Sequence, residues 1–150
     1  MRELLQNHPL DLLILIPSLP DTASLKKLAL TSQYANWFHD LNLRLQFFTN
    51  CQVEDQKAIA AYFQDPITIA PLSEEEAAAF YNCQQIKPVF GKERQYIFPS
   101  LILKDGNEIL HQTRRINPSA IHNLLQAALK AQYSFLKESL ADPIDILSSL

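Results

Sequence analysis

The sequence predicts an α/β fold in which helices flank a four-stranded mixed sheet with the strand order 2-1-3-4. Two nearly unbroken apolar runs, Leu10–Ile16 and Tyr96–Lys104, are typical of strands covered on both faces, and therefore of central strands. Two further segments, Leu41–Phe47 and Glu108–Ile116, are less continuously apolar, which is typical of edge strands. The first and third strands are therefore central, and the second and fourth strands lie outside them, which gives the predicted order.

A long helix is predicted directly after the first strand, which ends at Pro17. Ser18 offers an N-cap, Pro20 is an early-helix proline, and Asp21 is an acidic residue at the third position after the cap. We therefore expect a helix from about Leu19 to His39, with a broad apolar face that packs on the sheet.

An enlarged helical connection is predicted between strands 2 and 3. One helix covers Val53–Phe63, and the short apolar stretch Ile67–Ala70 follows it. Ser73–Glu76 starts another helix, because acidic side chains favour the positive end of the helix dipole. That helix should stop before Pro88, and Val89–Gln95 is expected to be a loop.

The last third of the chain is predicted to be a hairpin followed by a helix. Asp105-Gly106 is a strong signal for a hairpin turn, and Asn117-Pro118 starts a final long helix. Without an internal repeat or a low-complexity linker, we expect one domain over residues 1–150. Its core covers about 10–133, and a C-terminal helical tail covers 134–150.

Composition excludes several classes of function. The formal net charge is −3, so there is no basic surface for nucleic acid or an anionic membrane. Only two glycines, Gly91 and Gly106, stand against nine prolines, so no glycine-rich phosphate loop or dinucleotide fingerprint is present. The four histidines (His8, His39, His111 and His122) fall on separate elements without metal-ligand spacing. We therefore expect no metal and no cofactor.

No segment has the features of a leader or of a membrane span. The apolar run at 10–16 is short, contains Asp11, and has no small-residue cleavage site after it. The expectation is a soluble protein without membrane insertion, cytoplasmic as given, or periplasmic if a leader was removed. The compartment itself stays unknown at this stage.

The stretch from Ile97 to Leu110 carries the first family resemblance. An apolar run with Pro99 at its start reverses at a tight turn, and a second strand and a helix follow. This pattern resembles the second half of the thioredoxin fold, in which a strand opens with a cis-proline beside the active site. The resemblance implies a binding surface beside Pro99, where backbone groups would meet a peptide or a partner loop.

The resemblance also implies a reactive cysteine between the first strand and its helix, but Pro17–Ser24 contains none, and the chain has no Cys-x-x-Cys. We therefore predict a redox-inactive, non-enzymatic protein-binding or assembly factor without catalytic residues. Its predicted binding residues are Ser18, Leu19, Pro20, Asp21, Phe98 and Pro99. The Trp37/Phe38 region and the apolar tail Ile144–Leu150 could widen that surface.

A second reading within the same fold is a monothiol oxidoreductase that uses Cys51 or Cys83. Cys51 follows strand 2 at its carboxyl end, the side of an open α/β sheet where sites are usually built. Cys83 falls on a predicted helix. The simpler interpretation of both is that they are small, half-buried apolar side chains.

The segment Leu15-Ile-Pro-Ser-Leu-Pro-Asp-Thr-Ala-Ser-Leu-Lys-Lys-Leu28 resembles the opening of TrbC-type conjugative pilus-assembly proteins. Members of that family have a thioredoxin-like fold, often without the cysteines, and act in type IV secretion. Pro66–Pro71 is loosely similar to the family as well. Redox-inactive chaperones of enzyme maturation and KaiB-like clock proteins share the general frame. The implied partner is another protein, with a second copy of this chain as a further candidate.

An alternative resemblance is to an F-box over residues 8–38, an adaptor that docks a ubiquitin-ligase scaffold. The leucine-proline pattern from His8 to Ser32 ends in Leu-Thr-Ser, as that motif does. Pro17, however, falls where the motif needs a continuous helix, and an interior proline costs a helix about 3 kcal/mol. A strand at Leu10–Ile16 would eliminate this alternative.

Overall fold

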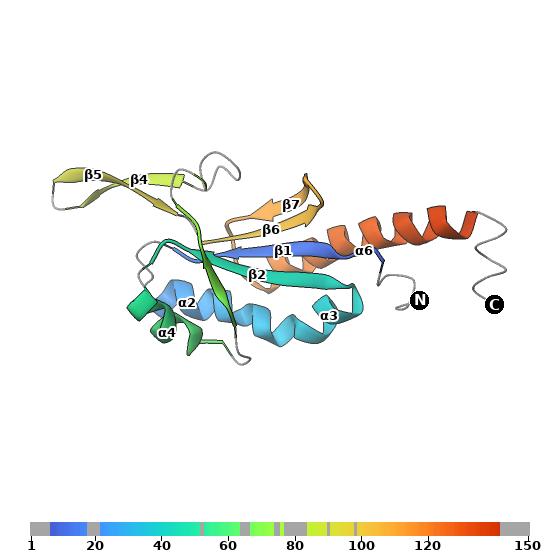
Figure 1. Cartoon of the computed structure of the whole chain (residues 1–150), viewed down its shortest axis with the longest axis horizontal. Helices are drawn as coiled ribbons and strands as arrows, with labels where there is room; N and C mark the ends of the chain where they lie inside the picture. Colours follow the sequence, from blue (N-terminus) through green and yellow to red (C-terminus); the bar gives the residue numbers. More distant parts are fainter. Residues whose placement is uncertain are drawn as a thin grey trace.

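The computed structural model describes residues 7–17, 22–51, 53–63, 67–73, 76, 84–89, 91–97 and 99–141. Its main sheet has five strands in the order β3-β2-β1-β6-β7, and β4 and β5 form a separate antiparallel hairpin (Figure 1). The strands are β1 (Leu10–Leu15), β2 (Leu43–Thr49), β3 (Ile69–Pro71), β4 (Gln84–Val89), β5 (Lys92–Ile97), β6 (Ser100–Asp105) and β7 (Glu108–Thr113). The β2-β1-β6-β7 part confirms the predicted order 2-1-3-4. β1 and β2 are parallel, and β6 and β7 are antiparallel to their neighbours.

The strand count differs from the prediction in two places. β3 pairs in parallel with the end of β2, with Phe47 opposite Ile69, so β2 is not an edge strand. Three residues are too few for a sequence pattern to reveal this strand. The stretch predicted as a loop at Val89–Gln95 instead supplies the turn and much of the hairpin β4–β5.

The single strand predicted over Tyr96–Lys104 is divided at Pro99. β5 ends at Ile97 and β6 begins at Ser100. Proline has no N–H to donate to a ladder, so it lies between strands here. The turn after β6 is confirmed: Asp105 pairs with Glu108, and Gly106 has a φ of 59°, which suits glycine.

The long helix predicted over Leu19–His39 is interrupted. The described part consists of α2 (Thr22–Ala29), the 3₁₀ segment η1 (Leu30–Tyr34) and α3 (Ala35–Asp40). The buried hydroxyl of Thr31 donates to the carbonyl of Leu28 at 2.7 Å, and such local bonds compete with regular helix geometry.

The other helices are placed close to their predictions. α4 covers Val53–Ala60, and the long α6 covers Pro118–Ala141, with the Asn117 side chain accepting from the Ala120 N–H at 2.8 Å as its N-cap. Ser73 and Glu76 exchange the hydrogen bonds of a capping box. The last part of the helix predicted there is wrong, because Gln84–Lys87 belong to β4. Residues 77–83 and the tail Ile144–Leu150 lie outside the described residues.

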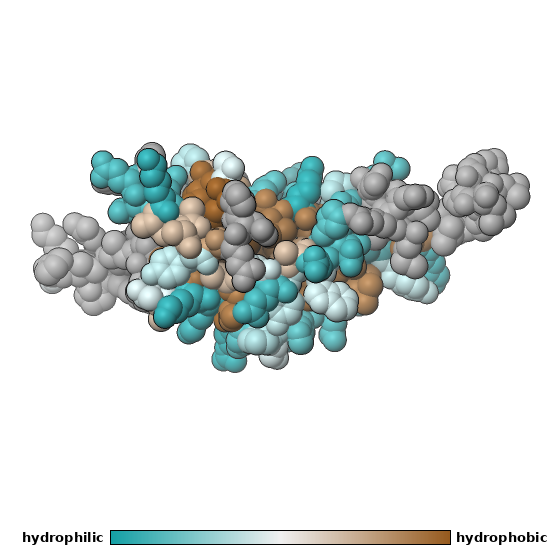
Figure 2. Space-filling model, turned by 90° about the horizontal axis from the view of Figure 1, so that it is seen from below, coloured by the Kyte–Doolittle hydropathy of each residue, from teal (hydrophilic) through white to brown (hydrophobic). Residues whose placement is uncertain are grey.

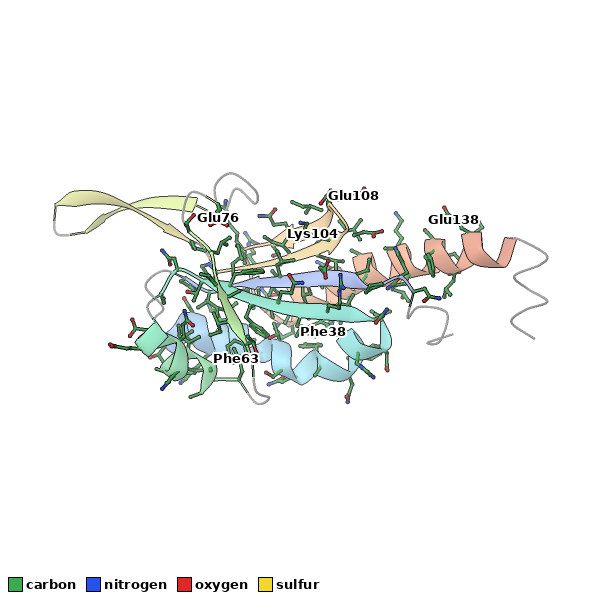
Figure 3. All side chains as sticks on the ribbon, viewed as in Figure 1. Phe38, Phe63, Glu76, Lys104, Glu108 and Glu138 are labelled. Atoms are coloured by element: carbon green, nitrogen blue, oxygen red, sulfur yellow. The ribbon has the colours of Figure 1, made fainter. Side chains whose placement is uncertain are left out.

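Alternation along β1 divides the core into two clusters. Leu12 and Ile14 face the larger cluster, to which α2, α3, α4 and α6 contribute, so the helices cover one face of the sheet. Figure 3 shows Phe38 and Phe63 on that helical side. Leu13 faces the smaller cluster on the other side of the sheet.

The far part of α6 is fastened to the start of β1 by a buried glutamine. Gln132 Nε2 donates to the carbonyl oxygens of His8 at 2.9 Å and Leu41 at 2.8 Å. Its Oε1 lies 2.7 Å from His8 Nδ1, and His8 Nε2 lies 3.1 Å from a carboxylate oxygen of Asp105. The His8 ring also stacks on Phe135 at a centroid distance of 4.3 Å. One side chain thus joins α6 to the segment just before β1 and to the turn after α3.

Within the part of the chain that the structure describes, no helix has both the length and the apolar character needed to cross a membrane.

Candidate functional site

One edge of the sheet gathers segments that are far apart in the sequence. Leu15, at the end of β1, pairs with Phe48 of β2 on one side and with Ser100 of β6 on the other. The residues that follow β1 and β2, and Pro99 just before β6, therefore lie at the same edge. The carboxyl ends of parallel strands form such edges, where sites on open α/β sheets are usually built.

Of the six residues predicted to bind a partner, the structure describes Pro99, which is half-buried. Ser18–Asp21 and Phe98 lie outside the described residues. The described residues contain no cis peptide bond, but the Phe98–Pro99 bond includes Phe98 and is not among them. The predicted cis-proline and the predicted binding surface thus stay predictions.

Cys51 lies at this edge, two residues after β2, and is half-buried. Its Sγ donates to the carbonyl oxygen of Pro17, just after β1, over 3.4 Å. Its N–H donates to Thr49 Oγ1 at 3.2 Å, and Gln56 Nε2 donates to its carbonyl oxygen at 3.1 Å. These bonds fix the thiol beside the end of the central strand.

Two opposing electrostatic effects act on the Cys51 thiol. α4 begins at Val53, so the thiol lies near the positive end of a helix dipole, which favours a thiolate. The hydrogen bond from Sγ to the Pro17 carbonyl oxygen stabilises the protonated thiol and therefore disfavours the thiolate. A thiolate is the nucleophilic form of cysteine, so the balance of these effects bears directly on reactivity.

A basic pocket of about 460 Å³ opens at the same edge, on the β6–β7 side. The pocket lies beside Pro99, between the first turns of α2 and the segment that follows β7. The sequence did not predict that these two segments are neighbours. Its lining residues are Ser24, Lys27, Pro99, Arg114, Arg115, Ile116 and Asn117. None of the basic residues Lys27, Arg114 and Arg115 was predicted to belong to a site.

An apolar groove lies between α3 and α6, with Trp37 and Leu129 at its wall. Trp37 is 61% exposed, whereas Phe38 is 1% exposed and belongs to the core. The Trp37 carbonyl oxygen accepts from the Leu41 N–H near the start of β2, so Trp37 lies at the opposite end of the strands from Pro99. The pairing of Trp37 with Phe38 as one exposed region is therefore wrong, because neighbouring helix positions point in directions about 100° apart. Figure 2, which views the molecule from the side of α2 to α4, shows patches of hydrophobic residues among hydrophilic ones.

Among the described residues there is no group of three or more histidine, cysteine, aspartate or glutamate side chains that could hold a metal ion. His122 lies edge-on to Tyr34 at a centroid distance of 5.6 Å, and His8 takes part in the Gln132 network.

No family model matches the sequence, and no curated protein is similar to it in sequence. Solved structures do share the fold. Peroxiredoxin Q from Xanthomonas campestris has a TM-score of 0.62 and 16% identity, over 85% of this chain and 84% of its own. Peroxidoxin BcpB from Mycobacterium tuberculosis has a TM-score of 0.62 and 14% identity, over 86% and 83% of the two chains.

A third similar structure is the bacterioferritin comigratory protein of Xanthomonas campestris, described for its alkyl peroxide reduction activity. It has a TM-score of 0.60 and 14% identity, over 83% of this chain and 81% of its own. Together these likenesses show that the chain has a thioredoxin-like fold. They give no support to the resemblance to TrbC-type proteins. The F-box alternative is eliminated because Leu10–Leu15 is a strand.

The prediction of a redox-inactive, non-enzymatic factor for assembly, conjugation, secretion or chaperoning is wrong. It depended on the missing Cys-x-x-Cys, whereas the similar solved structures include peroxiredoxins, one of them described for alkyl peroxide reduction. Prediction looked for a thiol between β1 and α2. The structure has one on the neighbouring strand, with Cys51 in contact with the end of β1. The monothiol alternative names Cys51 from its place at the carboxyl end of strand 2, but does not predict its contact with the end of β1.

Proposed function

We propose that this protein is a thiol-dependent oxidoreductase that reduces a hydroperoxide, with Cys51 as its nucleophile. The observation that carries the proposal is the position of Cys51 at the carboxyl edge of β1 and β2, where its Sγ lies 3.4 Å from the Pro17 carbonyl oxygen at the end of the central strand. The thiol is half-buried, so a small peroxide can reach it while its backbone stays fixed. The peroxiredoxin neighbours, one of them described for alkyl peroxide reduction, supply the reaction class.

The reaction is a two-electron transfer at sulfur. The Cys51 thiolate attacks the terminal oxygen of the hydroperoxide, a bond from sulfur to oxygen forms, and the O–O bond breaks. Sulfur becomes a sulfenic acid, and the leaving alkoxide takes a proton from water to give the alcohol. A thiol reductant then forms a disulfide with Cys51 and releases water, and a second thiol returns Cys51 to its reduced form.

The rate at which Cys51 reduces the hydroperoxide should rise with pH, since the thiolate and not the thiol is the nucleophile.

The experiment follows the loss of cumene hydroperoxide with dithiothreitol as the reductant. The wild-type protein should consume peroxide faster than dithiothreitol does by itself, and Cys51→Ser should reduce the rate to that background. Cys83→Ser is the matched control, because dithiothreitol replaces any need for a second cysteine, and it should keep the activity. Wild-type protein at the background rate, or an active Cys51→Ser variant, would overturn the proposal.

A further inference from the structure

The basic pocket has a charge opposite to that of the whole chain. The chain has a formal net charge of −3, whereas the pocket is lined by Lys27, Arg114 and Arg115. None of its lining residues that the structure describes is acidic. Basic groups gathered in a concave site concentrate the field and attract anions more strongly than the same groups scattered on a surface.

Local hydrogen bonds fix the backbone that carries these charges. Thr113 Oγ1 donates to the carbonyl oxygen of Arg115 at 2.9 Å and accepts from the Arg115 N–H at 3.1 Å. The next residue, Ile116, is buried in the core. Asn117 then caps α6, because its Oδ1 accepts from the Ala120 N–H. This hydrogen bond also holds the rest of the Asn117 amide group in one orientation. The two arginines therefore extend from a short, anchored segment.

The opposite wall of the pocket comes from α2. Ser24 lies in the first turn of that helix, and Lys27 follows one turn later. The side chains of Lys27 and of both arginines are exposed at the rim, so an entering ligand can reach them without movement of the core.

The size and apolar part of the pocket point to an organic ligand rather than to a bare ion. About 460 Å³ falls within the range of roughly 300–1,000 Å³ that is typical of small-molecule sites. Pro99 and the buried Ile116 supply an apolar wall beside the charges.

We infer that this pocket binds a small phosphate monoester, with its phosphate on Lys27, Arg114 and Arg115 and its organic group against Pro99. A phosphate monoester carries about −1.5 to −2 charges at neutral pH, and its oxygens match the planar fork of an arginine. Cys51 is not among the described residues that line the pocket, although its Sγ contacts Pro17 and the pocket reaches Pro99 at the same edge of the sheet.

Isothermal titration calorimetry with phenyl phosphate, at a constant ionic strength set with sodium chloride, tests the inference. Inorganic phosphate and benzoate are titrated in parallel to separate the phosphate from the ring. Phenyl phosphate should bind most tightly, because only it uses both the basic rim and the apolar wall. The double variant Arg114→Gln/Arg115→Gln, and Lys27→Gln separately, should each weaken it at least about tenfold.

Arg44→Gln is the matched control, since Arg44 is an exposed arginine on β2, paired with Asp11 at 2.9 Å and absent from the pocket lining. It should change the affinity less than about twofold. Equal loss in the control would mean that general charge, not the pocket, attracts the anion, and would overturn the inference. No binding of phenyl phosphate, or benzoate binding as tightly, would overturn it as well. The Cys51→Ser variant should bind normally, so this test and the peroxidase test fail independently.

Discussion

Replacing Gln132 by leucine should destabilise the fold by about 3 kcal/mol. Leucine has a similar size, so packing is largely kept. The change removes both donations from Nε2, to His8 and Leu41, and the contact between Oε1 and His8 Nδ1. Each intramolecular hydrogen bond contributes about 1 kcal/mol net, and buried acceptors left without a donor add to the cost. Gln132 is 1% exposed, so water does not replace the lost partners in the native state.

Urea unfolding followed by circular dichroism measures this loss. For a chain of this size, about 3 kcal/mol should also lower the melting temperature by roughly 6–12 °C. Gln126→Leu, an exposed glutamine on the same helix, is the matched control and should stay within about 0.5 kcal/mol of wild type. A loss below about 1 kcal/mol for Gln132→Leu, or an equal loss in both variants, would refute the assigned role of Gln132 in joining α6 to β1.

Three further changes test other parts of the fold by the same urea unfolding. Gly106→Ala should cost about 1–2 kcal/mol, because φ is 59° there and an added Cβ meets no atom within 4 Å, so the cost is conformational only. Asn117→Ala should cost about 1 kcal/mol, since it removes the acceptor that caps α6, and Asn117→Asp should keep the stability. Phe38→Ala should cost about 3–5 kcal/mol through the cavity it leaves in the larger core cluster. A neutral Phe38→Ala would contradict the placement of α3 against the sheet.

The parts of the fold that could be predicted from sequence are those with strong local signals. Leu10–Ile16 is apolar enough to require a central strand, Asp105-Gly106 specifies its turn through backbone conformation, and Asn117-Pro118 starts α6 through capping. Each of these depends on a few neighbouring residues. Their arrangement then follows, because two central strands need two outer ones.

The parts that could not be predicted depend on contacts between distant segments. β3 exists because Ile69–Pro71 finds the end of β2, and its three residues carry no periodicity of their own. The β4–β5 hairpin includes Pro88, which was interpreted as a helix stop. The candidate sites also depend on contacts between distant segments. Cys51 contacts Pro17, which is 34 positions earlier in the chain, and Lys27 lines the same pocket as Arg114, which is nearly ninety positions later.

The measurement that tests the central claim most directly is a single-turnover reaction of the reduced protein with one equivalent of cumene hydroperoxide. The products are trapped with dimedone and mapped by peptide mass spectrometry. The account predicts a dimedone adduct on Cys51 that forms as the peroxide is consumed, with Cys83 modified much more slowly. An adduct confined to Cys83, or peroxide consumption without any adduct on Cys51, would contradict the role of Cys51 as the reactive thiol.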